Sequence, residues 1–165
     1  MAKGITSEAH SILLGAALAF VASTTCAETL TGTASVIDAD TLEIHGQRIR
    51  LEGIDAPESG QRCYNSDAAW RCGQQASLAV SDMIARRPIV CEINSVDRYG
   101  RSLGTCYLDQ TDLNGLIVSE GWALAYTRYS KRYVAHEVEA QRYNRGIWNS
   151  TFVAPWDWRR GGRLK

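Results

Sequence analysis

The sequence predicts an α+β fold: a five-stranded OB-type Greek-key barrel with three helices packed against it. Five short stretches carry strand-like patterns, the first helical pattern follows the third strand, and two helical segments follow the fifth. This order of elements suits a closed or partly open OB-type barrel. The chain of 165 residues is long enough for one domain with a substantial core.

The first three strands are predicted before Pro57. Residues 29–37 are rich in Thr, Val and Ile, which favour strands. Residues 41–44 and 47–51 alternate in polarity on either side of a His-Gly pair, which predicts a hairpin. The second arm of this hairpin is expected to direct alternate residues inward (Ile49, Leu51) and outward (Arg48, Arg50).

The first helix is predicted to follow a polar loop at residues 59–71. Residues 72–87 carry apolar side chains at helical spacing, and Pro88 ends the pattern. Residues 89–93 and 102–108 are the fourth and fifth strands.

Two helices are predicted near the C-terminus. Asp112 is suited to cap a short helix that ends at Gly121. The last helix is expected at about residues 132–145, with Gly146 just beyond its end.

The N-terminal 27 residues are predicted to be a signal peptide. Residues 11–22 form an apolar run that is shorter than the ~20 residues needed to cross a bilayer. Thr25-Cys26-Ala27 permits cleavage before Glu28, and a lipid-anchored Cys26 or an uncleaved anchor are the alternatives. We therefore expect an exported domain at residues 28–165, with no membrane span after cleavage, a core at about 30–150 and a tail at 151–165.

Four cysteines remain after the leader is removed. Cys91 and Cys106 flank a predicted turn symmetrically, so a hairpin sets them opposite each other. Cys63 and Cys72 would tie the polar loop to the first turn of the helix. Two disulfides, at ~2–3 kcal/mol each, agree with export. The alternatives are a zinc site, which the lack of a Cys-x-x-Cys pair disfavours, and four reduced thiols.

Charge is unevenly distributed along a chain of zero formal net charge. Residues 28–121 contain 8 basic and 14 acidic residues, whereas residues 122–165 contain 9 and 3. The acidic part fits a cation site, and the basic tail is suited to hold a polyanion. The alternative for the tail is a frayed, solvated C-terminus.

Asp40 and Asp55 lie where predicted strands end. Two carboxylates that meet repel each other unless a cation lies between them, and oxygen ligands favour Ca²⁺ or Mg²⁺. The alternative is that both are ordinary turn residues, Asp55 making an Asx-type bond before Pro57.

Arginines and a glutamate flank these aspartates. Arg50 precedes Asp55 by five residues, and Arg101 follows a turn; both are candidate phosphate clamps, although Arg101 is also suited simply to pair with Asp97. Glu58 is a candidate general base or a surface glutamate in a loop. The aromatic candidates for base stacking, each also suited to be core or surface filler, are Tyr99 and Tyr126.

Four ordered motifs resemble the staphylococcal nuclease (thermonuclease) family of calcium-dependent phosphodiesterases. Residues 37–41 resemble I-D-G-D-T, and residues 50–58 reproduce R-x-x-x-x-D-x-P-E without a gap. Residues 97–101 resemble D-K-Y-G-R, and residues 121–126 resemble G-L-A-x-A-Y. The resemblance extends from about residue 35 to 148, and its OB-type barrel agrees with the strand order above.

The resemblance implies a role for each matching residue. Asp40 and Asp55 correspond to side-chain ligands of Ca²⁺, and Ala56 to a main-chain carbonyl ligand. Arg50 and Arg101 correspond to phosphate-binding arginines. The remaining correspondences are Glu58 with the proposed general base, Asp97 with a supporting acid, and Tyr99 and Tyr126 with nucleotide-contacting tyrosines.

Two motif positions depart from the family pattern, because Ala39 replaces glycine and Ala56 replaces threonine. The lysine-rich surface of the family's prototype is also absent, and the hairpin within residues 42–49 is shorter than the prototype's. Alanine in place of glycine at position 39 would strain the turn if residue 39 needed positive φ.

Together these features predict an exported, Ca²⁺-dependent monomeric nuclease. Its expected partners are DNA and RNA, with single-stranded or unpaired regions preferred and 3′-phosphate ends as products. The alternative functions are a non-catalytic OB-fold module that binds nucleic acid or another anion, and a secreted interaction module.

Overall fold

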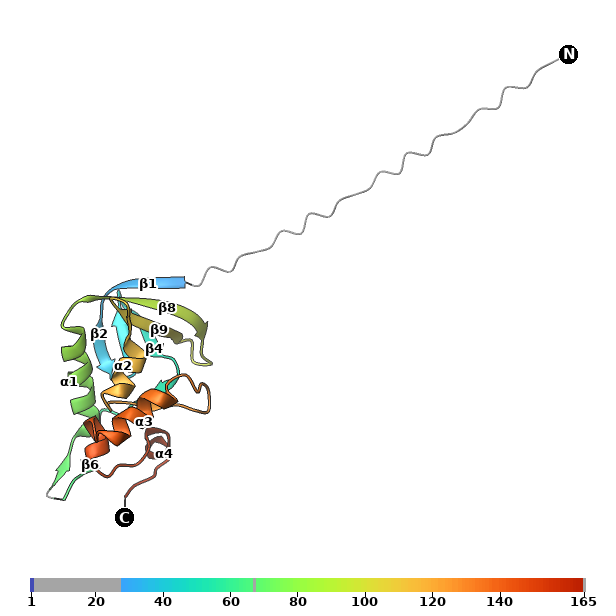
Figure 1. Ribbon diagram of the computed structural model, residues 1–165. Helices are drawn as coiled ribbons and strands as arrows, with labels where there is room; N and C mark the ends of the chain where they lie inside the picture. Colours follow the sequence, from blue (N-terminus) through green and yellow to red (C-terminus); the bar gives the residue numbers. More distant parts are fainter. Residues whose placement is uncertain (2–27, 67, 165) are drawn as a thin grey trace.

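The computed structural model describes Met1, residues 28–66 and residues 68–164 (Figure 1). The predicted signal peptide, apart from Met1, lies outside the described residues. In the described part of the chain, no helix combines the length and the apolar character that a membrane crossing requires.

One seven-stranded sheet forms the body of the molecule, in the order β1-β8-β9-β4-β3-β2, with β10 added beside β9. Most neighbours are antiparallel, and β4 pairs with β9 in parallel. The strands are β1 (Glu28–Thr33), β2 (Ser35–Asp38), β3 (Thr41–Ile44), β4 (Gln47–Leu51), β8 (Pro88–Val96), β9 (Ser102–Leu108) and β10 (Thr111–Asp112).

The predicted first strand is divided at Ala34 and links both edges of this sheet. Its first half, β1, pairs with β8, and its second half, β2, pairs with β3. Because the chain runs directly from one half to the other, the sheet curls back on itself. The predicted OB-type barrel is therefore confirmed, with β1 and β2 acting as one strand.

The predicted hairpin is formed by β3 and β4. His45 and Gly46 form its turn with φ of 51° and 80°, the positive values that two-residue hairpin turns require. Ile49 and Leu51 are buried as expected. Arg48 is exposed, whereas the Arg50 side chain is only 17% exposed. Arg50 therefore does not project into bulk solvent but lies in a cleft.

Four α-helices are present in the described residues, and three of them were predicted (Figure 1). Asp112 caps α2 as expected, accepting a hydrogen bond from the amide of Gly115. The predicted last helix is shorter and is followed by a 3₁₀ turn at Gly146–Asn149. The helices are α1 (Cys72–Ile84), α2 (Leu113–Ser119), α3 (Val134–Arg142) and the unpredicted α4 (Pro155–Arg159).

The main core lies between the barrel and the helices α1 and α2. Alternate residues of β3, β4 and β8 contribute to it, as the two-residue period of a strand requires. Helix α1 contributes Ala76, Val80 and Ile84, which lie on one helical face.

A second apolar cluster lies where the tail returns to the barrel. Trp148, Phe152 and Trp156 pack around the buried Cys63–Cys72 pair. The predicted loop at residues 59–71 contains a small hairpin, β6 (Cys63–Tyr64) with β7 (Ala69–Trp70). The tail is therefore folded against the domain and is not frayed, because its aromatic side chains Phe152 and Trp156 are partly buried there.

Both predicted disulfides are present. Cys91 and Cys106 are register partners on β8 and β9, as the symmetric spacing about the turn predicts. The other bridge joins Cys63 of β6 to Cys72 at the start of α1.

Candidate active site

The predicted acidic residues lie together at one end of the barrel. Asp40 lies in the turn between β2 and β3, and Asp55 ends the two-residue strand β5 (Ile54–Asp55). Strand β5 pairs with β11 (Leu124–Ala125), which places Asp55 opposite Leu124. The two aspartates are 3% and 0% exposed, respectively.

Ala39 does not strain the turn that holds Asp40. Among the described non-glycine residues, positive φ occurs at His45, Ala85, Arg86, Asp109 and Asn144. Ala39 is fully buried in the core. The turn therefore needs no glycine at this position.

Arg50 joins the two buried aspartates. Its Nη1 donates to Oδ1 of Asp40 at 2.8 Å, and its Nη2 donates to Oδ1 of Asp55 at 2.6 Å. Asp40 also accepts hydrogen bonds from the Thr41 hydroxyl at 3.0 Å and the Ala56 amide at 2.9 Å. The guanidinium and both carboxylates are thus held in fixed relative positions.

Burial and neighbouring charge set the acidity of this cluster. Burial raises the pKa of Asp55, and the carboxylate of Asp40 adds to this effect, while hydrogen bonding to Arg159 opposes it. Burial also raises the pKa of Asp38, and the charges of Asp40 and Glu58 raise it further. Burial and like charge together therefore disfavour the ionised forms of Asp38 and Asp55 at this end of the barrel.

Glu58 lies in the segment between β5 and β6. Its carbonyl accepts a hydrogen bond from the Gln61 amide at 2.7 Å, and its amide donates to Oε1 of Gln61 at 3.3 Å. Gly73 of α1 abuts the same carbonyl so closely that a Cβ would overlap it. The backbone that carries Glu58 is thus fixed, while the Glu58 side chain is 37% exposed.

Arg101 pairs with Asp97 at the turn between β8 and β9. Its Nη2 lies 2.7 Å from Oδ2 of Asp97, and its Nε donates to the same oxygen at 2.8 Å. The amides of Tyr99 and Arg101 donate to the other carboxylate oxygen. Desolvation raises the pKa of Asp97, but these hydrogen bonds outweigh it and lower the pKa. Asp97 thus restrains the guanidinium of Arg101.

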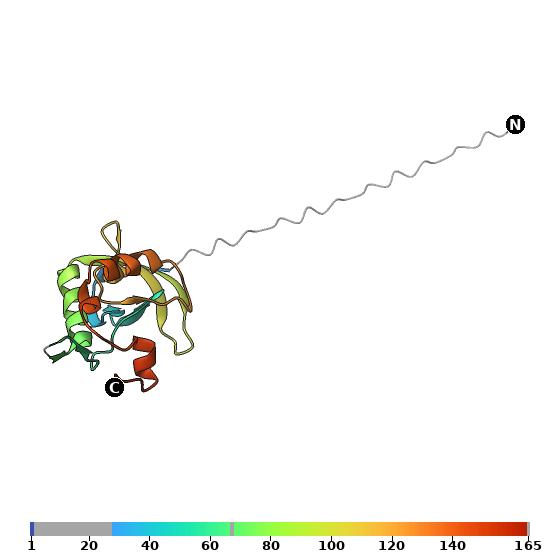
Figure 2. The ribbon, with the colours of Figure 1, turned by 60° about the horizontal axis from the view of Figure 1, so that its bottom comes forward.

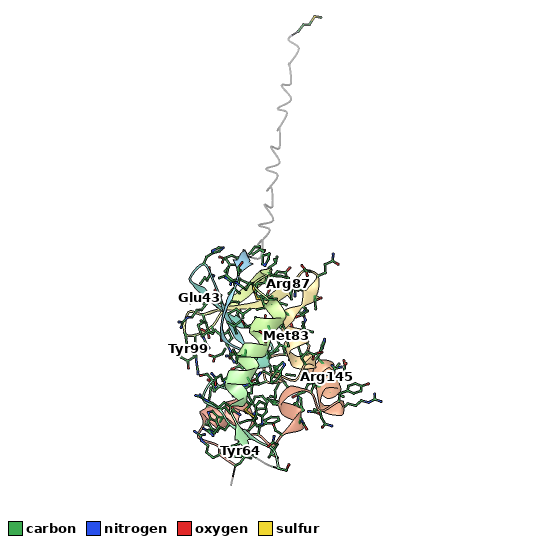
Figure 3. All side chains as sticks on the ribbon, turned by 90° about the vertical axis from the view of Figure 1, so that its left-hand side faces the viewer. Glu43, Tyr64, Met83, Arg87, Tyr99 and Arg145 are labelled. Carbon is green, nitrogen blue, oxygen red and sulfur yellow. A yellow bond between two sulfur atoms is a disulfide. The ribbon has the colours of Figure 1, made fainter. Side chains whose placement is uncertain are left out.

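The two predicted tyrosines lie in the same cleft but in different environments. Tyr99 is 68% exposed, and Figure 3 shows it at the edge of the molecule opposite Arg145. The guanidinium carbon of Arg98 lies 4.7 Å from the Tyr99 ring centroid. Tyr126 instead stacks on Trp156 of α4, with centroids 5.4 Å apart and planes 6° apart.

Arg159 is a site residue that the sequence reasoning did not identify. Its Nη2 donates to Oδ2 of Asp55 and its Nη1 donates to Oε1 of Glu58, at 2.6 and 2.7 Å. It comes from α4, the short helix near the C-terminus in Figure 2. The basic composition of the tail was a signal for anion contact, and Pro155 at the first helical position was a signal for the helix. Neither signal identified which anions the tail contacts.

One cleft of about 970 Å³ collects these side chains. All of the predicted acids and arginines line this cleft except Asp55. Asp55 is fully buried beneath it and is hydrogen-bonded to Arg50 and Arg159, which do line the cleft. Acids that repel one another beside fixed guanidinium groups are suited to bind a cation and a phosphate together. The predicted residues that line the cleft are Asp40, Arg50, Ala56, Glu58, Asp97, Tyr99, Arg101 and Tyr126.

The donor set fits a hard cation. Asp40 and Asp55 offer carboxylate oxygens, which Ca²⁺ and Mg²⁺ prefer. Burial, and after it the charge of Asp40, raises the pKa of Asp55 even though Arg50 bridges the two carboxylates. Burial, and after it the charges of Asp40 and Glu58, likewise raises the pKa of Asp38. In the described part of the chain, no three His, Cys, Asp or Glu side chains already converge as a metal cluster.

Comparisons with known proteins identify the family of this chain. Residues 48–150 match the protein family described as "Staphylococcal nuclease homologue". A micrococcal nuclease of Shigella flexneri is 33% identical over 146 residues, covering 78% of this chain and 79% of the relative.

Two further relatives carry other names. The "Succinoglycan biosynthesis protein ExoI" of Rhizobium meliloti (strain 1021) is 39% identical over 128 residues, which cover 75% of this chain and 67% of the relative. "Protein ParB" of Escherichia coli is 31% identical over 162 residues, which cover 87% of this chain and 86% of the relative. The family match spans more than half of this chain and includes the segments that carry Arg50, Asp55, Glu58 and Arg101. The chain therefore belongs to the staphylococcal nuclease family and is a nuclease, as its motifs predict.

Proposed function

We propose that this protein is an exported, Ca²⁺-dependent nuclease that hydrolyses phosphodiester bonds in DNA and RNA. The observation that carries the proposal is the bridging of two buried aspartates by Arg50 in a cleft that also contains Glu58 and Arg101. Arginine in such a position is fixed before substrate arrives. The name of the Shigella flexneri relative, micrococcal nuclease, supports the same activity.

Asp40, Asp55 and the main-chain carbonyl of Ala56 are the residues that would hold Ca²⁺. When bound, the ion supplies Lewis-acid polarisation of the phosphate and neutralises part of its charge. The chain's own contribution is a rigid pair of carboxylates. Arg50 and the Ala56 amide restrain Asp40, which limits the reorganisation needed on binding.

The remaining residues act on the water and the phosphate. Glu58 is proposed to take a proton from the attacking water, for which its carboxylate is partly exposed in the cleft. Arg50 and Arg101 are proposed to donate to phosphoryl oxygens as negative charge develops on them. A guanidinium has five N–H donors, so binding to an aspartate leaves others for the phosphate. In-line attack with departure of the 5′-oxygen would leave 3′-phosphate ends.

Tyr99 and Tyr126 are proposed to contact the bases. A base stacks on an aromatic face only when it is not already stacked within a duplex, so unpaired nucleic acid is the expected substrate. The exposed ring of Tyr99 lies beside Arg98 and Arg101, which adds cationic groups for the flanking phosphates.

Export is supported by the cysteines and by the leader. The disulfides Cys63–Cys72 and Cys91–Cys106 fit an oxidising compartment. The apolar run at residues 11–22 and the small residues after it have the pattern of a signal peptide.

Incubation of the exported protein with heat-denatured DNA and with RNA tests the activity. Glu58→Gln serves as the matched control, since it keeps the shape of the side chain and removes its basicity. We expect the wild type to produce fragments with 3′-phosphate ends and the variant to cleave about 10²–10⁴-fold more slowly. Binding of both nucleic acids without cleavage would instead support a non-catalytic binding module.

A further inference from the structure

Arg159 neutralises two acids of the active site from the far end of the chain. One guanidinium nitrogen contacts Asp55, which is fully buried, and the other contacts Glu58. The two bonds measure 2.6 and 2.7 Å. A single planar fork thus connects a proposed metal ligand to the proposed general base.

Every carboxylate oxygen of the two proposed metal ligands already has a donor. Oδ1 of Asp40 accepts from Arg50 and Thr41, and Oδ2 accepts from the Ala56 amide. On Asp55, Oδ1 accepts from Arg50 and Oδ2 accepts from Arg159. A cation that binds Asp55 through Oδ2 would therefore be repelled by the guanidinium of Arg159, which lies 2.6 Å from that oxygen, and the two positive charges compete for it.

Of the two guanidinium groups, that of Arg159 is the easier to displace. The Arg50 side chain is 17% exposed and joins two buried aspartates, so its removal would leave two buried charges. The Arg159 side chain is 37% exposed, and water can solvate it when it leaves. Stacking of Trp156 on Tyr126 holds α4 against the domain, so the exchange requires movement of a side chain and not of the helix.

We propose that Arg159 is a displaceable counter-cation of the active site, which neutralises Asp55 and Glu58 in the Ca²⁺-free protein and is exchanged for Ca²⁺. The inference rests on the proposed Ca²⁺ dependence. It has two consequences. Competition by Arg159 weakens Ca²⁺ binding, and Glu58 is released from its ion pair only when the metal arrives. The metal thus makes the general base available as well as binding the phosphate.

Calorimetric titration with Ca²⁺ in the absence of nucleic acid tests the competition directly. Arg159→Gln removes the competing charge, and Arg160→Gln is the matched control because Arg160 pairs with Asp157 one turn away on the surface. We expect Arg159→Gln to lower the Kd for Ca²⁺ roughly tenfold, equivalent to about 1.4 kcal/mol. We expect little change in the Kd for Ca²⁺ in Arg160→Gln, since an exposed charge that does not contact the site acids is well screened by solvent and salt.

Three outcomes of this titration would overturn the inference. An unchanged or raised Kd in Arg159→Gln would mean that Arg159 does not compete with the ion. An equal decrease in Kd in both variants would mean that only the overall charge of the tail affects Ca²⁺ binding. If wild type and both variants all fail to bind Ca²⁺, the proposed Ca²⁺ dependence fails as well, whereas the first two outcomes leave it intact.

Thermal unfolding of the same proteins provides a second readout. With a chelator present, Arg159→Gln should unfold at a lower temperature than wild type, because Asp55 has lost one of its two arginines. In saturating Ca²⁺ the two should unfold at nearly the same temperature, since in both proteins the ion then occupies that position. A difference that persists in Ca²⁺ would show that Arg159 remains on Asp55 and would overturn the exchange.

Discussion

Nη2 of Arg50 lies 2.6 Å from Oδ1 of Asp55, a carboxylate that is fully buried. The two residues are five positions apart, on β4 and at the end of β5. The intervening chain turns at Gly53, whose φ of 77° is positive. This turn allows an arginine from one strand and an aspartate from the next to meet at the same end of the barrel.

Replacing Arg50 with lysine should impair both stability and cleavage. Lysine keeps the positive charge but lacks the planar fork that binds Asp40 and Asp55 together. Because a partner is lost from buried charges, we expect the Ca²⁺-free protein to lose about 2–4 kcal/mol of unfolding free energy. Denaturant unfolding measures this loss. Arg48→Lys, on the exposed face of the same strand, should change stability by less than about 0.5 kcal/mol.

Adding a methyl group at Gly73 should displace Glu58. Within a helix, glycine to alanine is usually stabilising by about 1 kcal/mol, but here the new Cβ would overlap the Glu58 carbonyl. Backbone cannot move as easily as a side chain, so we expect a net loss of about 1–3 kcal/mol and slower cleavage. Gly60→Ala is the control, because open space surrounds that position. Equal activity in the two variants would contradict the proposed position of Glu58.

The two disulfides should contribute differently to activity. Replacing Cys91 and Cys106 with alanine removes a bridge across 15 residues and should cost about 3 kcal/mol. Cys63 and Cys72 are nine residues apart, so the loop-entropy contribution is smaller, at about 2.5 kcal/mol. The second bridge, however, anchors the segment that follows Glu58, so its loss should also slow cleavage at temperatures where the protein stays folded. Unfolding curves and cleavage rates of the two double variants test this difference.

Tyr133 should make the fold sensitive to alkaline pH. Its ring is buried and its hydroxyl donates to Asp112 at 3.0 Å; burial, and then the charge of Asp112, raise its pKa. Because the pKa of Tyr133 is higher in the folded protein than in the unfolded chain, the stability that its neutral hydroxyl contributes is fully present below pH ~10. That stability declines as pH rises above the pKa of tyrosine in the unfolded chain. Tyr133→Phe should lose about 1 kcal/mol at pH 7 and show a shallower decline above pH ~10. Unfolding free energies of both proteins at pH 7 to 11 measure this, and parallel curves would contradict it.

Local patterns were sufficient to predict most of the barrel. The β3–β4 hairpin depends on alternation over a few residues and on the His45-Gly46 turn, all of which are adjacent in sequence. The interruption of the first strand at Ala34 was not predicted. It arises because β1 pairs with β8 whereas β2 pairs with β3, and such pairing between distant segments leaves no local pattern in the sequence. The Cys91–Cys106 bridge could be predicted because both residues lie on one hairpin.

The same distinction explains which site residues could be identified. Asp40 precedes Arg50 by ten residues and Asp55 follows Arg50 by five, so the three form a recognisable local spacing. Arg159 reaches Asp55 across 104 positions of sequence, through a path set by packing of the tail aromatics on the domain. Composition marked the tail as basic, but no local rule relates a tail arginine to one buried aspartate.

The rate of cleavage of heat-denatured DNA as a function of free Ca²⁺ tests the central claim most directly. We expect a saturable rise for the wild type and no cleavage in excess chelator. Asp40→Asn, which removes the charge of one proposed ligand, should need much higher Ca²⁺ to reach half of its maximal rate. Cleavage that persists in chelator, or an Asp40→Asn curve that coincides with that of the wild type, would contradict a Ca²⁺-dependent nuclease site at the end of this barrel.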